Sequence, residues 1–399
     1  MYKGLYTYPW DLADEGQDEV GARIRDAGLN TITLATSYHA GKFLRPHGRS
    51  GKVYFPKDGT VYFEARPERY GHIKPIVNPL VDEFDALAEL EKAAPDLDRV
   101  AWVVCCHNSA LGEQHPEHVS RNAFGDPYLY SLCPAHPAVR DYVVNLVGDL
   151  VDRHPLAGVA LETPGWLPYD HGYHHEFAML PLDRWAKTLL ALCFSETTRR
   201  AAKAVDIDAD RLQAKARELL ERYFAADLAV PETMAAEWWL ADLVADPEWT
   251  AFLNWRCRVV ADLVAAVKGV VPAGTWLAVI PTVRRPTAAA WLEGSDLAML
   301  AAACDALEIP AYQASAEEVR LDAWDVRRRV GDDARLHFIL RPSFPDLANG
   351  AETALAARHL KEAGAGGMAF YNYGHIRLSS LRHIKAAVSE LEADEPISG

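Results

Sequence analysis

Short apolar, β-branched runs alternate with amphipathic helical stretches from one end of the chain to the other. A short apolar run predicts a buried strand, and apolar residues three or four positions apart predict a helix packed over it. The predicted strands are residues 5–8, 31–36, 100–105, 158–161, 276–280, 306–311, 336–340 and 368–371. Strands and helices in this alternation are typical of an α/β fold with a closed parallel (β/α)8 TIM barrel. The first turn, Thr7-Tyr8-Pro9-Trp10, lacks the glycines of a doubly wound nucleotide-binding sheet.

Two long segments depart from the simple alternation. After the second strand, residues 38–80 form an insertion, in which Lys57-Asp58-Gly59 between the runs 52–55 and 60–63 predicts a β-hairpin. After the fourth strand, residues 181–270 are almost wholly helical by periodicity, with breaks near Asp206 and Pro231. This stretch is too long for one crossover helix, so we expect a helical elaboration. Because such barrels often exceed about 250 residues as one domain, we expect residues 1–399 to form a single barrel domain that includes both segments.

Charge and cysteine content narrow the classes of partner. The formal net charge is −15 and no run is rich in Lys or Arg, which argues against a nucleic-acid surface and against anionic lipid. The N-terminus lacks the apolar stretch of a signal peptide, and no apolar run approaches the ~20 residues that span a bilayer. The six cysteines show no CxxC spacing, so we expect free thiols in a reducing cytoplasm. The oligomeric state stays open, a homo-oligomer included.

Polar or aromatic residues follow every predicted strand. In a barrel of this class the active site lies where the strands run out into the following loops, so this convergence predicts a binding site at that face. In chain order, these strand-end residues are Tyr8, Trp10, Tyr38, His39, His107, Asn108, Glu162, Trp166, Tyr169, Thr282, Arg284, Arg285, Tyr312, Gln313, Arg341, Asp346, Tyr371, Asn372, Tyr373 and His375.

Carboxylates are the first candidates for chemistry at this face. Glu162 follows Val159-Ala160-Leu161, at a strand end where an unpaired carboxylate costs free energy unless it is hydrogen-bonded or functional. Glu308 is the preferred second carboxylate, because it points into the barrel if Leu307 and Ile309 face the helices. Two carboxylates that flank a sugar bond support hydrolysis with either stereochemical outcome. Asp346 and Asp170 are the reserve candidates. The alternatives are a loop anchor for Glu162 and an ion pair with Arg284 or Arg341 for Glu308.

The segment Asp170-His171-Gly172-Tyr173-His174-His175-Glu176 packs three histidines and two acids together. Such density fits a transition metal, but the spacing matches no HExxH motif. It equally fits a loop in which His171, His174 and His175 bond substrate hydroxyls, or a solvated loop. We favour substrate contact, with no metal and no other cofactor.

Aromatic and basic side chains complete the predicted site. Flat rings stack on the C–H faces of sugars, and phenol and indole groups bond hydroxyls. Arg284 and Arg285 are suited to hold a carboxylate or phosphate in two parallel hydrogen bonds, the alternative being salt bridges to nearby acids. The expected substrate-binding residues are Tyr8, Trp10, His39, His107, Asn108, Trp166, Tyr169, His171, His174, His175, Arg284, Tyr312, Arg341, Tyr371, Tyr373 and His375. Trp238 and Trp239, in the helical segment, are expected to pack in a core.

Five segments together resemble uncharacterised TIM-barrel proteins grouped with glycoside hydrolases. They are Gly158-Val159-Ala160-Leu161-Glu162, His171-Gly172-Tyr173-His174-His175-Glu176, Leu192-Cys193-Phe194-Ser195, Ile309-Pro310-Ala311-Tyr312 and Phe370-Tyr371-Asn372-Tyr373-Gly374. The resemblance covers most of the chain and is loose between Ser37 and Leu80. It implies a glycoside hydrolase barrel.

The chain departs from the largest clan of retaining barrel glycosidases, which usually carries Asn-Glu at strand four and a Glu at strand seven. Here strand four ends in Leu161-Glu162 and strand seven in Leu340-Arg341-Pro342, which favours a pair from strands four and six. The predicted function is hydrolysis of a glycosidic bond in a small soluble carbohydrate by Glu162 and Glu308. The alternatives are a metal-dependent lyase or isomerase that uses Glu162 with His171, His174 and His175, and a non-catalytic carbohydrate-binding barrel.

Overall fold

In the computed structural model, eight parallel strands close into a barrel, which confirms the predicted (β/α)8 fold. The structure describes residues 1–173 and 176–393. Each barrel strand pairs with the next, and β1 pairs with both β2 and β14, which closes the sheet. The barrel strands are β1 (Tyr2–Thr7), β2 (Thr31–Tyr38), β7 (Asp98–Val104), β10 (Gly158–Glu162), β11 (Trp276–Ile280), β12 (Ala306–Pro310), β13 (Leu336–Leu340) and β14 (Ala365–Phe370).

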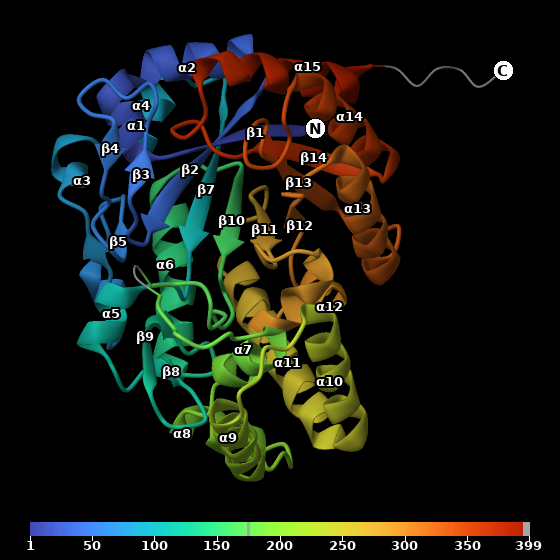
Figure 1. Ribbon diagram of the computed structural model, residues 1–399. Helices are drawn as coiled ribbons and strands as arrows, with labels where there is room; N and C mark the ends of the chain where they lie inside the picture. The colour runs from blue at the N-terminus through green and yellow to red at the C-terminus, as the bar shows by residue number, and fades with distance from the viewer. Residues whose placement is uncertain (174–175, 394–399) are drawn as a thin grey trace.

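Helices follow the strands and cover the outside of the barrel (Figure 1). They include α1 (Pro9–Glu15), α2 (Gln17–Asp26), α3 (Leu80–Glu83), α4 (Ala86–Ala93), α6 (Pro137–Arg153), α12 (Leu297–Ala303), α13 (Ala316–Val330), α14 (Gly350–Glu362) and α15 (Leu381–Glu392), with short 3-10 turns η1 (Pro67–Arg69), η2 (Thr287–Glu293) and η3 (Leu378–Ser380). Within the described residues, no helix is long and apolar enough to cross a membrane.

The alternation of side chains along each strand produces two cores. On β12, Leu307 and Ile309 lie in the apolar layer between strands and helices, and Glu308 between them points into the barrel. The barrel interior is filled largely by aromatic rings, among them Tyr6, Tyr8 and Trp102. All six cysteines are free thiols, five of them buried.

The insertion after β2 is built differently from the prediction. The short strands β4 (Val53–Tyr54) and β5 (Thr60–Val61) do not form the expected hairpin with each other. Instead β4 pairs with β3 (Phe43–Leu44), and β5 pairs with β2 and β6 (Ile76–Val77). The hairpin prediction was wrong because the turn at Lys57-Asp58-Gly59 fixes only a local reversal, whereas β5 pairs with the last two residues of β2, Ser37 and Tyr38.

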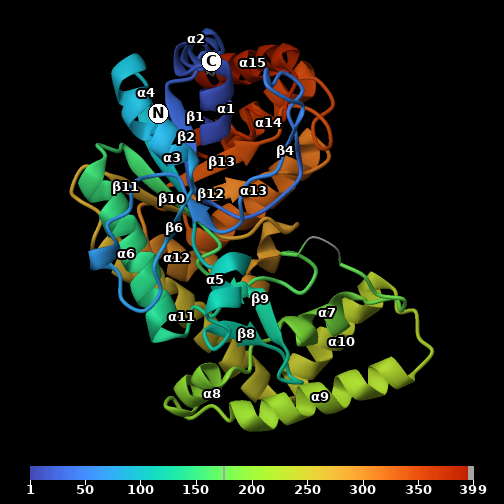
Figure 2. The same cartoon turned by 90° about the vertical axis from the view of Figure 1, so that its left-hand side faces the viewer.

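The segment after β10 is helical as expected and lies at the face where the barrel strands end. It comprises α7 (Arg184–Ala191), α8 (Glu196–Lys203), α9 (Ala209–Ala225), α10 (Glu232–Ala245) and α11 (Pro247–Lys268). The arrowheads of β2, β7 and β10 point toward these helices in Figure 1, and Figure 2 shows α7 to α10 set beside the barrel. The helices enclose an apolar cluster of their own, with Trp239 buried in it and Trp238 packed against it. That these segments and the barrel form one domain stays a prediction.

A further structured segment links β7 to α6. The helix α5 (Ser109–Gln114) begins directly after His107-Asn108 and packs on the antiparallel pair β8 (Val119–Arg121) and β9 (Pro127–Leu132). None of these elements was predicted from the sequence. This segment and the insertion after β2 lie together at one side of the barrel mouth (Figure 2).

Candidate active site

Glu162 is the last residue of β10 and is partly buried at the mouth of the barrel. The indole Nε1–H of Trp102, on the neighbouring strand β7, donates to Glu162 Oε2. Burial raises the pKa of Glu162 to about 7, and the bond from Trp102 opposes that rise. Thr163, the next residue, has φ 51°, a strained conformation for a β-branched residue and one that clusters at functional sites. A carboxyl that still holds its proton near neutral pH is suited to act as a general acid.

Tyrosines from three strands lie around this carboxyl. The Tyr8 hydroxyl is 2.9 Å from that of Tyr38 and 3.0 Å from that of Tyr371. Burial chiefly, and the charge of Glu162 in addition, raise the pKa of both Tyr38 and Tyr371. The Nε2 of His375 lies 3.4 Å from the Tyr8 hydroxyl. The phenols therefore stay protonated and form one hydrogen-bonded set beside Glu162.

A second buried carboxyl, Glu293, belongs to the same region and was missed by the sequence analysis. It is the last residue of η2, and Thr282 Oγ1 donates to its Oε1 at 2.6 Å. Burial raises the pKa of Glu293 to about 7, and the Glu162 charge adds to the rise. Glu293 comes well after the end of β11 in sequence, so a search restricted to strand ends does not find it. Its one cue is the helix end at Gly294, which is not specific to function.

Glu308 lies deeper in the barrel than the mouth. Its side chain is fully buried, and the Tyr2 hydroxyl donates to its Oε1 at 3.0 Å. Burial raises the pKa of Glu308 to about 7, and hydrogen bonds from Tyr2 and Tyr6 oppose that rise. Tyr2 begins β1, so these contacts place the carboxyl toward the end of the barrel opposite the mouth. The structure thus surrounds Glu308 with interior tyrosines rather than with the residues of the mouth.

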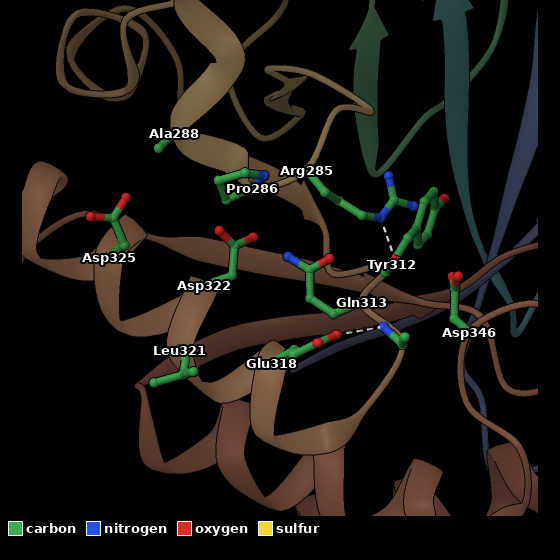
Figure 3. Close-up of a pocket in the computed structure, with 11 residues that line it drawn as sticks. Arg285, Pro286, Ala288, Tyr312, Gln313, Glu318, Leu321, Asp322, Asp325 and Asp346 are labelled. Atoms are coloured by element: carbon green, nitrogen blue, oxygen red, sulfur yellow. Dashed lines mark hydrogen bonds between the residues drawn. The ribbon is translucent and has the colours of Figure 1, made fainter. Parts of the chain in front are cut away.

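Asp346, on the loop between β13 and α14, lines a cavity of about 750 Å³ together with Arg285 and Tyr312 (Figure 3). The Arg341 guanidinium lies 3.9 Å from the centre of the Tyr312 ring, and its Nη1 donates to Asp346 Oδ2 at 3.5 Å. Burial raises the pKa of Asp346, while Arg341 and Arg285 lower it. The Tyr312 ring also contacts Tyr371, 5.9 Å between ring centres, so this cavity adjoins the tyrosines around Glu162.

A smaller cavity of about 330 Å³ is lined by His39, His107 and His171. His39 stacks on Tyr38 at 4.4 Å and on His107 at 4.1 Å, and His171 meets His107 edge-on. Asp170 lines the same cavity and forms an ion pair with Arg284. His174 and His175 lie outside the described residues. The tyrosines beside Glu162 therefore contact the lining of both cavities, through Tyr312 of the larger one and His39 of the smaller one.

Four predicted binding residues are held in structural contacts. Asn108 caps α5 by accepting from Leu111 N and donates to Gly59 O, where a Cβ on Gly59 would lie 2.0 Å from Asn108 Oδ1. Trp166 lies under the Arg256 guanidinium, and the Tyr373 hydroxyl donates to Glu15. Trp10 stacks between Tyr8 and Tyr54. Tyr169 lines a separate cavity of about 380 Å³ with Tyr128 and Tyr130.

No known family model matches this chain, and no curated protein matches its sequence. Solved structures are similar in fold. The glycoside hydrolase domain of PgaB (BpsB) from Bordetella bronchiseptica is 14% identical, with a TM-score of 0.61 over 96% of this chain and 99% of that one. A β-galactosidase from the psychrophilic Marinomonas ef1 is 12% identical, with a TM-score of 0.55 over 98% of this chain and 59% of that one. The chain therefore shares the barrel fold of glycoside hydrolase domains.

Proposed function

We propose that this chain hydrolyses a glycosidic bond of a small carbohydrate, with Glu162 as the general acid. The observation that carries the proposal is the raised pKa of Glu162, about 7, at the mouth of a barrel whose fold is that of glycoside hydrolases. Protonation of the leaving oxygen requires a carboxyl that keeps its proton at working pH, and burial beside Trp102 and the tyrosines supplies that condition. Glu293 supports it, because two nearby carboxyls resist ionising together.

Asp346 is the carboxylate that we assign to the opposite side of the sugar. It follows strand seven of the barrel, whereas Glu162 ends strand four, so the two approach the mouth from well-separated strands. Burial raises the pKa of Asp346, and Arg341 and Arg285 oppose that rise and so support the ionised form that a nucleophile or a general base requires. Glu308 is fully buried among interior tyrosines, and we assign it to the support of the barrel rather than to the reaction.

The two cavities supply the substrate contacts. The ring of Tyr312 offers a face for sugar C–H groups, while Arg285 in the larger cavity and His39 and His107 in the smaller one offer donors for hydroxyls. An aromatic platform with a few convergent polar groups fits a neutral sugar better than a charged ligand. The substrate class that we propose is therefore a glycoside bound across the mouth, with its scissile oxygen at Glu162.

A panel of nitrophenyl glycosides tests the proposal. We expect turnover of at least one member, a loss of about 10²- to 10⁴-fold in kcat for Glu162→Gln, and a comparable loss for Asp346→Asn. Glu221→Gln, on an exposed face of α9, is the matched control and should keep full activity. Binding of sugars without turnover would instead support a carbohydrate-binding barrel, and full activity of Glu162→Gln would contradict the assignment.

A further inference from the structure

Three histidines and one glutamate converge at a place separate from the Glu162 region. The ligand atoms of His72, His115, Glu117 and His118 all lie within 4.8 Å of one another. His72 belongs to the insertion after β2, and the other three follow α5. His72 is far from the other three in sequence, so the group exists only because the insertion folds back over the end of α5.

The distances around Glu117 match the edges of a coordination tetrahedron. Glu117 Oε1 lies 3.4 Å from His118 Nε2, 3.5 Å from His72 Nε2 and 3.8 Å from His115 Nδ1. Ligand atoms at about 2.0–2.1 Å from a tetrahedral Zn²⁺ are about 3.3 Å from each other. Three imidazoles and one carboxylate oxygen are ligands that zinc accepts, and all four ligand atoms lie within 4.8 Å of one another, so the set closes on a metal ion as the side chains draw together.

His118 gives an independent indication of a ligand. Its ring is 7% exposed, and neither ring nitrogen has a hydrogen-bond partner among the described residues, because the approach to Glu117 lacks hydrogen-bond geometry. A buried polar atom left without a partner costs about 1–3 kcal/mol, so such an atom requires an explanation.

The backbone around the four residues is fixed. His115 N donates to Leu111 O at the end of α5, and His118 N donates to His115 O, both at 2.9 Å. His72 lies between the buried residues Tyr70 and Ile73, and the Tyr70 hydroxyl bonds Asp149 Oδ2 at 3.1 Å. The fold therefore fixes the backbone that carries the ligands, while the exposed side chains of His72 and Glu117 can still adjust to a metal.

We propose that His72, His115, Glu117 and His118 form a structural zinc site that fastens the insertion after β2 to α5. At the other end of α5, Asp58 Oδ2 already accepts from Ala110 N at 2.9 Å. The metal would hold the C-terminal end of the same helix. His107, which lines the 330 Å³ cavity, lies just before the N-terminal end of that helix. Four protein ligands leave no open position, as in zinc sites that stabilise a fold rather than react.

Zinc titration of the untagged, chelator-treated full chain tests the site. Calorimetry with ZnCl₂ should give one Zn²⁺ per chain, and Co²⁺ should give the intense visible bands of four-coordinate cobalt. His72→Ala and Glu117→Gln change exposed side chains, so both variants should fold, and each should weaken zinc binding by at least about 100-fold. Zinc should also raise Tm in the wild type and not in His72→Ala.

Two controls make the result decisive. His359→Ala, on α14, and His171→Ala, in the histidine-rich loop after β10, should both bind zinc as the wild type does. Absence of zinc binding by the wild type would overturn the proposal. Equal binding by the wild type and His72→Ala, or loss confined to His171→Ala, would overturn it as well.

Discussion

The indole of Trp102 donates its Nε1–H to Oε2 of Glu162, from one barrel strand to its neighbour. Trp102 pairs with Ala160, two residues before Glu162, so the ring reaches along the barrel to the carboxyl at its mouth. The bond favours the ionised form, while burial favours the protonated form and prevails, which leaves a pKa of about 7. This balance sets the pH range in which Glu162 can donate a proton.

Removal of the indole donor should move the pH profile. Trp102→Phe deletes the bond that lowers the pKa of Glu162, so that pKa rises. A general acid works only while protonated, and the descending alkaline limb of kcat/KM near pH 7 should shift upward by roughly 1–2 pH units. Trp324→Phe, an exposed residue on α13, is the control and should leave the limb unmoved. An unchanged limb in Trp102→Phe would show that another group controls it.

Glu308 should make stability depend on pH in a defined direction. Its folded pKa of about 7 lies above the ordinary value of 4.5, so the folded state holds the extra proton between these values. The contribution of Glu308 to the free energy of unfolding is fully present below about pH 4.5. It is lost as the pH rises through about 7, a change of about 3 kcal/mol. Glu308→Gln cannot ionise, and it should therefore unfold at a higher temperature than the wild type at pH 8.

Thermal unfolding of Glu308→Gln and the wild type at pH 5 and pH 8 checks this sign. The difference in Tm between the two proteins should be small at pH 5. At pH 8 the variant should have the higher Tm. The exposed Glu221→Gln should follow the wild type at both values. A variant that is less stable at pH 8 would mean that the folded protein prefers the ionised carboxylate.

Arg341 should control the acid limb through Asp346. The guanidinium lowers the pKa of Asp346 against the effect of burial, so Arg341→Met should raise it. If Asp346 must be ionised to act, the ascending limb of kcat/KM at low pH should move to higher pH. The variant should also raise KM, because Tyr312 and Asp346 of the cavity wall both lose the cation that they contact. If KM rises and the acid limb of the pH profile does not move, Arg341 acts in substrate binding and not through the pKa of Asp346.

The barrel could be predicted from the sequence because each strand is a local apolar run. Residues 276–280 and 336–340 were predicted with the bounds that β11 and β13 have. Helical breaks near Asp206 and Pro231 were also correct, since Asp206 has φ 61° and Pro231 precedes α10.

Features that depend on distant pairing could not be predicted. β4 and β5 pair with strands outside the local turn. Glu293 lies near the mouth although it ends η2. His72 contacts His118 only because the insertion folds back over the end of α5. The position of Glu308 shows the same limit. Alternation along β12 fixed its inward direction, but its depth depends on Tyr2, which comes from the other end of the chain.

The leaving-group dependence of Glu162→Gln tests the central claim most directly. A general acid matters most when the leaving group is a poor one, so the variant and the wild type should be compared on alkyl, nitrophenyl and dinitrophenyl glycosides of the same sugar. If Glu162 is the acid, the loss in kcat/KM should be about 10²- to 10⁴-fold for the alkyl glycoside and should shrink toward none for the dinitrophenyl glycoside. An equal loss for all three leaving groups, or no loss for any, would contradict the account.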